Sequence, residues 1–440
     1  MRVNEFYLNQ KLESSKSKFF MNKIRSVLSK LRYNKLIIEN YFFMTVLQLL
    51  NSLFYIIIYP FVIRKLGAEN YGTYVFSLSI VTYFIVLISF GFDLPSVNKI
   101  SKDSGNFELK SKTVSDVLTS KLYLFIASSI LFSVVLFFVN SLEKYSTILF
   151  IIYFQTILTV LVPTWYFQGV QKMKIVTYFQ IIFKVLSLPF IFWFISKPND
   201  LDLFSIIITV STLFSGVSIF VYLLYVEKLN IRLMPFLNVK KAIAEAMPFF
   251  WSSSTSIIRQ QSTNIIIGIF IGMNGVAYFD LASKLILLPQ SLAMSINGAL
   301  FPKVVSSEKI DTVLVKKIIK YEIYFGLFVI VMIALFAKYA ILFLGGKSMM
   351  PAYNLTLLLS FTILTWLIVG CYINFIFVPQ NKYYYITYNQ FVAFFVYILV
   401  SVIGVLIYKD IYVIVIATVI SGFSEILYCR YVISKNKLFN

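Results

Sequence analysis

Apolar runs of about twenty residues recur along the whole of this 440-residue chain and constrain its fold more than any other feature. A helix needs about 20 mostly apolar residues to cross a bilayer, and the segments of a membrane barrel are only about ten residues long and alternate. We predict a membrane-spanning helix in each of these runs: 41–63, 71–92, 118–140, 146–168, 175–196, 203–226, 247–271, 275–300, 319–341, 351–377, 384–407 and 411–433. The sequence therefore predicts an all-α integral membrane protein with about 12 transmembrane helices.

Charge indicates how these helices are oriented. With the N-terminus placed inside, most of the 39 Lys and Arg residues fall in cytoplasmic segments, as the positive-inside rule requires. We therefore expect both termini on the cytoplasmic side of a bacterial inner membrane. The run 41–63 is too long for the apolar core of a signal peptide and should remain in the protein, whether translation starts at Met1 or Met21.

Several classes of chemistry are excluded or disfavoured. The chain has no His, and its two Cys, Cys371 and Cys429, lie inside apolar runs, so we expect no metal site, no cofactor and no enzyme activity. The net charge of +20 is spread over short strips between apolar runs, which argues against nucleic-acid binding. The segment Gly345–Ser348 lacks the first Gly of a nucleotide-binding loop. Any active transport should therefore use a gradient, with H+ or Na+ as a possible coupling ion.

The two halves of the chain resemble each other. Leu66-Gly67 recurs as Ile271-Gly272, and Gly91 and Pro95 recur as Gly298 and Pro302. Six helices per half give parallel repeats related by a pseudo-two-fold axis along the membrane normal, a transporter architecture. We predict a basic cytoplasmic segment 1–40, an N-lobe 41–226, a cytoplasmic linker 227–246, a C-lobe 247–434 and a cytoplasmic tail 435–440.

Five ionisable residues are expected near the bilayer centre in the predicted helices: Lys184, Arg259, Asp280, Lys284 and Glu425. Charges at this depth are costly and usually face a bundle interior or a watery cavity. Asp280 and Lys284 are four residues apart on one helix face and should form an ion pair. Glu425 is a candidate coupling-ion site or a partner of one of the cations. Lys184 is a candidate substrate contact, or an interfacial anchor if its helix begins later.

Polar residues on two helices are further candidates for contact with a substrate. Gln261 and Asn264 follow Arg259 on one face of run 247–271, and Gln48 and Asn51 share a face of run 41–63. Each group could line a cavity or join helices through hydrogen bonds. Because Arg and Lys in a low-dielectric cavity attract anions, and guanidinium groups match phosphate geometry, the expected substrate is anionic.

Three sequence segments resemble the Wzx-type polysaccharide flippases of the multidrug/oligosaccharidyl-lipid/polysaccharide exporter superfamily. They are Arg64–Gly72, Phe90-Gly91 and Pro163–Gly169, and Gly275, Tyr278, Lys284 and Phe301-Pro302 add weaker matches. The resemblance implies a two-lobed antiporter that moves undecaprenyl-pyrophosphate-linked oligosaccharide (O-antigen, capsule or exopolysaccharide units) to the external leaflet by alternating access. It also implies a monomeric transport unit that works beside a polymerase and chain-length machinery. A drug or small-solute exporter, or a membrane glycosyltransferase or polymerase, are the alternatives.

Overall fold

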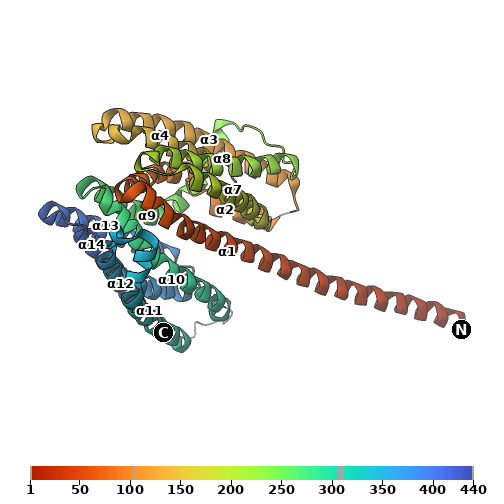
Figure 1. Cartoon of the computed structure of the whole chain (residues 1–440). Coiled ribbons are helices and arrows are strands. Elements are labelled where there is room, and N and C mark those ends of the chain that lie inside the picture. Colours follow the sequence, from red (N-terminus) through yellow and green to blue (C-terminus); the bar gives the residue numbers. More distant parts are fainter. Residues whose placement is uncertain (1, 104, 306–311, 439–440) are drawn as a thin grey trace.

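A computed structural model describes the backbone of residues 2–103, 105–305 and 312–438. Side chains are described from residue 39 onward, apart from 41, 48–49, 52–53, 55, 104, 252–253, 292–312 and 439–440. The described chain is built of helices with short connections, and no strand occurs within it (Figure 1). The all-α prediction is therefore confirmed.

The first half of the chain runs through eight α-helices. These are α1 (Arg2–Ser89), α2 (Asp93–Lys102), α3 (Phe107–Phe138), α4 (Ser146–Tyr153), α5 (Leu158–Leu161), α6 (Thr164–Gly169), α7 (Met173–Phe194) and α8 (Leu201–Tyr225). The second half contains α9 (Phe236–Phe270), α10 (Met273–Val305), α11 (Thr312–Gly345), α12 (Ala352–Tyr372), α13 (Tyr383–Tyr408) and α14 (Ile411–Lys435). A π-helical turn, Ile373–Phe377, extends α12. The predicted linker 227–246 is only partly a connection, because α9 already begins at Phe236.

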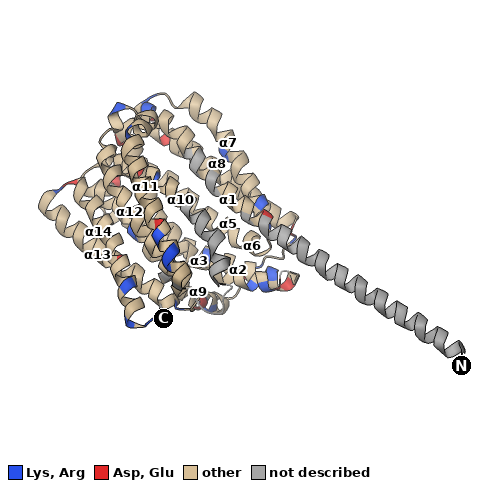
Figure 2. Cartoon of the chain, turned by 90° about the horizontal axis from the view of Figure 1, so that it is seen from below, with Lys and Arg blue, Asp and Glu red and all other residues tan. Residues whose placement is uncertain are grey.

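Nine helical stretches within the described residues are long and apolar enough to cross a membrane, which indicates a multi-pass membrane protein. They are Ile56–Ser89, Phe107–Phe138, Asn140–Gly169, Met173–Phe194, Pro198–Tyr225, Val313–Gly345, Ala352–Phe377, Tyr383–Tyr408 and Ile411–Lys435. Figure 2 shows long uncharged stretches along these helices. The predicted runs 247–271 and 275–300 form α9 and α10, which are helical but not among the nine. The arrangement is consistent with twelve spans, and that number stays a prediction.

Gly67 divides the long helix α1. Its backbone angles, φ 82° and ψ 165°, are not helical, and only glycine adopts them without a steric penalty. Runs 41–63 and 71–92 therefore belong to two helices that meet at a kink at Gly67, and we call these helices the first and second arms of α1. Gly272, with φ 113°, separates α9 from α10 in the same way. Gly67 and Gly272, which the sequence repeat pairs with each other, thus lie at equivalent helix breaks in the two halves.

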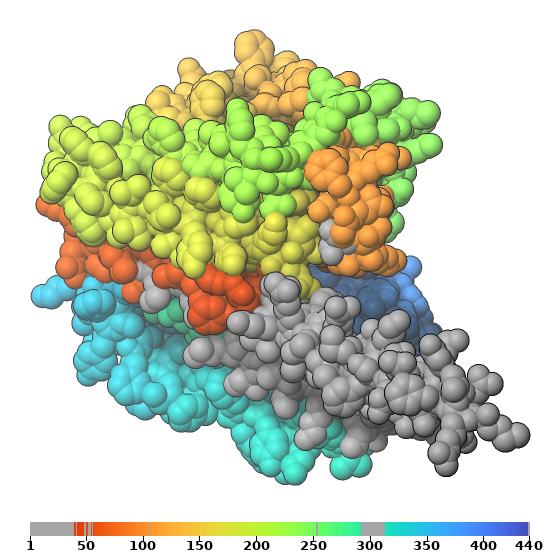
Figure 3. Space-filling view, turned by 90° about the vertical axis from the view of Figure 1, so that its right-hand side faces the viewer, coloured from red at the N-terminus to blue at the C-terminus, as the bar shows by residue number. Residues whose placement is uncertain are grey.

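The second arm of α1 lies between the two groups of helices. Helices α3, α4, α7 and α8 gather on one side of it and α10–α14 on the other (Figure 1). In the space-filling view, part of α1 forms a red seam between the yellow-green and blue portions (Figure 3). One buried apolar cluster joins both groups, with Val62 and Tyr74 from α1 and Val276 and Leu281 from α10. The predicted lobe boundaries stay a prediction.

Candidate functional site between the two halves

Polar contacts join α1 to α9 at mid-length. Asn264 donates from Nδ2 to Ser79 Oγ at 2.9 Å, and the hydroxyls of Tyr83 and Ser262 lie 2.6 Å apart. The two helices also meet at the end where α1 reaches Gly91, where the Phe90 and Phe250 rings stack with centroids 4.5 Å apart. We call the two ends of the bundle the Gly91 end and the Gly67 end. The α1–α9 contact therefore runs from the middle of the second arm of α1 to the Gly91 end.

A charged cluster joins α1 to α10 near the Gly67 end. Lys284 donates from Nζ to Asp280 Oδ2 and to the Tyr71 hydroxyl, each at 2.7 Å. Tyr71 donates from its hydroxyl to the same Asp280 oxygen at 2.8 Å, so the three groups form a closed triangle. We call Tyr71, Asp280 and Lys284 the Tyr71 cluster. Its two charges cancel, and its hydrogen bonds connect the two halves of the chain.

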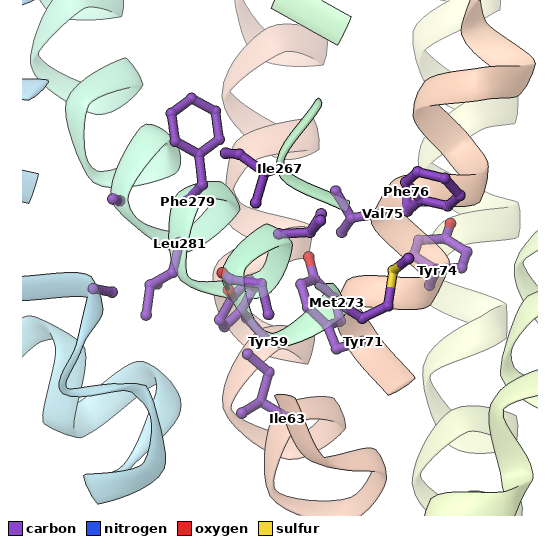
Figure 4. Close-up of a cluster of buried hydrophobic side chains, with 14 of the residues drawn as sticks. Tyr59, Ile63, Tyr71, Tyr74, Val75, Phe76, Ile267, Met273, Phe279 and Leu281 are labelled. Atoms are coloured by element: carbon purple, nitrogen blue, oxygen red, sulfur yellow. Dashed lines mark hydrogen bonds between the residues drawn. The ribbon is translucent and has the colours of Figure 1, made fainter. Parts of the chain in front are cut away.

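Aromatic rings surround this cluster. The Tyr59 and Tyr71 rings meet edge to face with centroids 4.9 Å apart, and Figure 4 shows them beside Met273 at the start of α10. The Lys284 ammonium lies 4.9 Å from the Tyr59 ring centroid, a cation–π distance. The ammonium therefore has a carboxylate, a hydroxyl and a ring face around it, which lowers the cost of placing a charge at this depth.

The backbones of α1 and α10 also touch beside the cluster. A Cβ atom on Gly72 would lie 1.8 Å from the carbonyl oxygen of Met273, far inside van der Waals contact. Glycine is the residue that permits such close helix approach. Arg64 adds a further bond between the halves, from Nη2 to the Phe343 carbonyl oxygen at 3.0 Å. The Gly67 end is thus closed by backbone contact and polar bonds together.

Breaking the Tyr71 cluster one charge at a time should cost more than removing both charges. We expect Asp280→Asn or Lys284→Gln alone to reduce export and folded yield, because each leaves one uncompensated charge. The double variant should recover most of the loss, as a double-mutant cycle of export and melting temperature would measure. Additive losses would argue that the two residues act separately.

Arg259 has an acidic partner inside the second half. Its Nη1 lies 2.6 Å from Glu425 Oε1 on α14, and Asn389 on α13 donates to the other carboxylate oxygen at 3.2 Å. Arg259 also approaches Ser421 Oγ at 3.4 Å. The side chain of Glu425 is 9% exposed and that of Arg259 is 25% exposed. This neutral group, the Arg259 cluster, joins α9, α13 and α14.

Lys184 lies apart from both clusters, in the first half. Its ammonium donates to Asn51 Oδ1 on the first arm of α1 and lies 5.3 Å from the centroid of the Phe54 ring. It therefore faces the bundle and not the bulk solvent at a helix end. The structure separates the five predicted charged residues into three places, and their roles in substrate contact stay predictions.

Of the other residues predicted to contact substrate, Gln261 and Asn264 lie on α9. Asn264 bonds to Ser79 between the halves, and Gln261 is partly buried on the same helix. The side chain of Gln48 is outside the described residues. Sequence reasoning missed Lys121, whose side chain is 4% exposed and pairs with Asp93 at 3.3 Å. Its position inside run 118–140 was the available signal.

The sequence and the fold match known proteins. The polysaccharide biosynthesis protein family matches residues 37–308, which is more than half of the chain. The chain belongs to this family. The resemblance to Wzx-type polysaccharide flippases is therefore confirmed at the level of the family.

Two curated relatives of this polysaccharide biosynthesis protein carry the name "Putative O-antigen transporter". The Escherichia coli (strain K12) protein is 25% identical over 278 residues, covering 62% of this chain and 66% of the relative. The Shigella dysenteriae protein is 26% identical over 258 residues, covering 58% of this chain and 63% of the relative. The chain thus matches just under two thirds of the length of these relatives. They are named as transporters and not as enzymes.

Solved structures share the fold. The lipid II flippase MurJ in an inward closed conformation superposes with a TM-score of 0.67 at 14% identity, covering 92% of this chain and 88% of MurJ. An inward-facing multidrug resistance MATE family transporter of the MOP superfamily gives 0.60 at 13% identity, covering 89% and 99%. At such low identity the likeness concerns the fold alone.

Proposed function

We propose that this protein is a flippase that moves undecaprenyl-pyrophosphate-linked oligosaccharide units from the cytoplasmic to the external leaflet by alternating access. The observation that carries the proposal is the Tyr71 cluster. It is a neutral, polar connection between the halves, made of hydrogen bonds that can break and form again, whereas apolar packing alone would suffice to hold a static bundle. The family and the names of the relatives support the polysaccharide class of substrate.

Orientation follows from the charge pattern, with both termini in the cytoplasm of a bacterial cell. The Gly67 end then faces outward, and the Tyr71 cluster and the Gly72–Met273 contact close it. Opening toward the outside would separate Lys284 from Tyr71 and expose its ammonium to an anionic headgroup. The lipid tail would stay in the bilayer while the headgroup crosses between the halves.

Contacts with the headgroup are proposed along the inner helix faces. Lys284 and Asn264 lie at the interface between the halves, Gln261 lies on α9, and Gln48 and Asn51 lie on the first arm of α1. Arg259 and Lys184 would supply further positive charge to the pyrophosphate or to acidic sugars. Fixed cations in a low-dielectric path attract phosphate strongly.

A coupling ion, H+ or Na+, is part of the proposal and would make the protein an antiporter. Asp280 and Glu425 are the candidate carboxylates, and each contacts a cation, at 2.7 Å for Asp280–Lys284 and 2.6 Å for Glu425–Arg259. These contacts favour the alternative in which both acids serve internal pairing. We also propose that the transport unit is monomeric and works beside a polymerase and chain-length machinery.

Export in a bacterial host tests the function. A strain without its own flippase should regain surface polysaccharide when this chain is expressed with the matching sugar pathway. An equally expressed Asp280→Asn variant is the matched control and should restore less. Resistance to cationic drugs without any surface polysaccharide would favour the small-solute exporter. Longer polysaccharide chains without a change in transport would favour a polymerase.

A further inference from the structure

Two cavities within the first half meet at Lys184. The Tyr71 cavity, of about 90 Å³, is lined by Tyr59, Tyr71, Gln155 and Lys184 among others. The Lys121 cavity, of about 330 Å³, is lined by residues that include Asp93, Lys121, Gln180, Lys184 and Ser215. Ser211 and Thr212 also line both cavities. All lining residues of both cavities belong to the first half, and the Tyr71 cavity borders the interface with α10 through Tyr71.

The Lys121 cavity carries one positive charge in excess. The charge of Lys121 is balanced by Asp93, whose Oδ1 lies 3.3 Å from the Lys121 ammonium. The ammonium of Lys184 contacts the amide oxygen of Asn51 and the Phe54 ring, and no carboxylate pairs with it among the described residues. Buried charges in proteins are normally paired, because an unpaired charge in a low-dielectric interior is costly. A counter-charge is therefore expected in this cavity.

Hydrogen-bond donors face the same cavity. An ammonium has three N–H donors, and only one is needed for the bond to Asn51. Ser215 Oγ is buried without a hydrogen-bond partner among the described residues, and it lines the Lys121 cavity. The Gln180 amide, also in the lining, supplies two further N–H donors. Unsatisfied buried polar groups are rare in proteins and usually mark a missing partner.

We propose that the Lys121 cavity binds one small monovalent anion, such as chloride, between Lys184, Gln180 and Ser215. A monovalent anion matches the single excess charge, whereas a pyrophosphate would leave the cavity negative. The adjoining Tyr71 cavity has room for only about three water molecules, so a sugar-bearing headgroup has no passage through it. The anion site shares Lys184 with the proposed headgroup contacts. It rests on the charge balance and the hydrogen-bond donors of the cavity, and it does not depend on the flippase proposal.

Binding of radioactive chloride to the purified full-length chain in lipid nanodiscs tests the proposal, with gluconate as the background anion. Wild-type protein should bind one chloride per chain. Lys184→Gln should weaken binding more than about tenfold, because a charged donor is lost. Lys184→Arg should retain binding. Lys174→Gln is the matched control, since Lys174 lies on the same helix but pairs with Glu39 at 3.2 Å, and it should bind as wild type.

Three results would overturn the proposal. They are no chloride bound by wild-type protein, equal binding by folded Lys184→Gln, and displacement of chloride by farnesyl pyrophosphate at equimolar amounts. The last would place the lipid headgroup in this cavity. If Lys184→Gln does not fold, Ser215→Ala keeps the test open, because it leaves the charge in place and should still weaken chloride binding measurably.

Discussion

Arg259→Gln should lower the free energy of unfolding by about 3–5 kcal/mol, the typical cost of removing one partner of a buried ion pair. Among the described residues, the substitution leaves the Glu425 carboxylate, 9% exposed, with the Asn389 amide as its one hydrogen-bonding partner. Because the carboxylate is almost completely buried, it regains little contact with water. Unfolding of the purified protein in mixed detergent micelles, followed by circular dichroism, would measure the loss.

The matched control for this prediction is the double variant Arg259→Met/Glu425→Leu. Replacing both members of a buried pair by apolar residues is often neutral for stability, so the double variant should unfold close to wild type. If it folds but fails to export, the cluster has a role in transport beyond holding α9 against α14. If Arg259→Gln unfolds like wild type, the pair contributes little and Arg259 is available to a substrate.

Gly72→Ala should separate α1 from α10 and destabilise the closed Gly67 end. The added Cβ would lie 1.8 Å from the Met273 carbonyl oxygen, which belongs to the backbone and cannot rotate away. Overpacking of this kind typically costs about 1–3 kcal/mol. We expect a lower melting temperature and a Tyr71 cluster that is pulled apart, so that an impermeant lysine-reactive label applied at the Gly67 end modifies Lys284.

Gly370→Ala is the matched control for Gly72→Ala. Gly370 lies within α12, and nothing approaches within 4 Å of the Cβ it would gain. Alanine in such a helix position stabilises by up to about 1 kcal/mol relative to glycine, so this variant should melt at or slightly above the wild-type temperature. Equal effects of the two substitutions would contradict the close contact at Gly72.

The all-α architecture was predictable because lipid imposes it. Backbone groups in a bilayer must bond within their own helix, so long apolar runs carry a strong signal. The breaks at Gly67 and Gly272 were also visible, as a repeat in the sequence. Two helices were predicted in runs 41–63 and 71–92, and the structure has two helical arms there that meet at Gly67. The sequence did not indicate that only this one non-helical residue would separate them.

The candidate site was only partly predictable, for reasons of distance along the chain. Asp280 and Lys284 are four residues apart, so helix geometry alone places them together, and they lie 2.7 Å apart in the structure. Arg259 and Glu425 are 166 positions apart, and their contact depends on how α9 packs against α14. The third member of the Tyr71 cluster comes from the other half of the chain. Local periodicity contains no such information.

Translocation in proteoliposomes tests directly whether the protein moves a lipid-linked oligosaccharide between leaflets. The purified chain would be reconstituted with a fluorescent undecaprenyl-pyrophosphate oligosaccharide, with and without an imposed H+ or Na+ gradient, beside vesicles that contain an equal amount of Gly72→Ala protein. We expect gradient-sensitive movement of the labelled lipid between leaflets with wild-type protein and slower movement with the variant. Folded wild-type protein that leaves the labelled lipid in its original leaflet under every gradient would contradict this expectation.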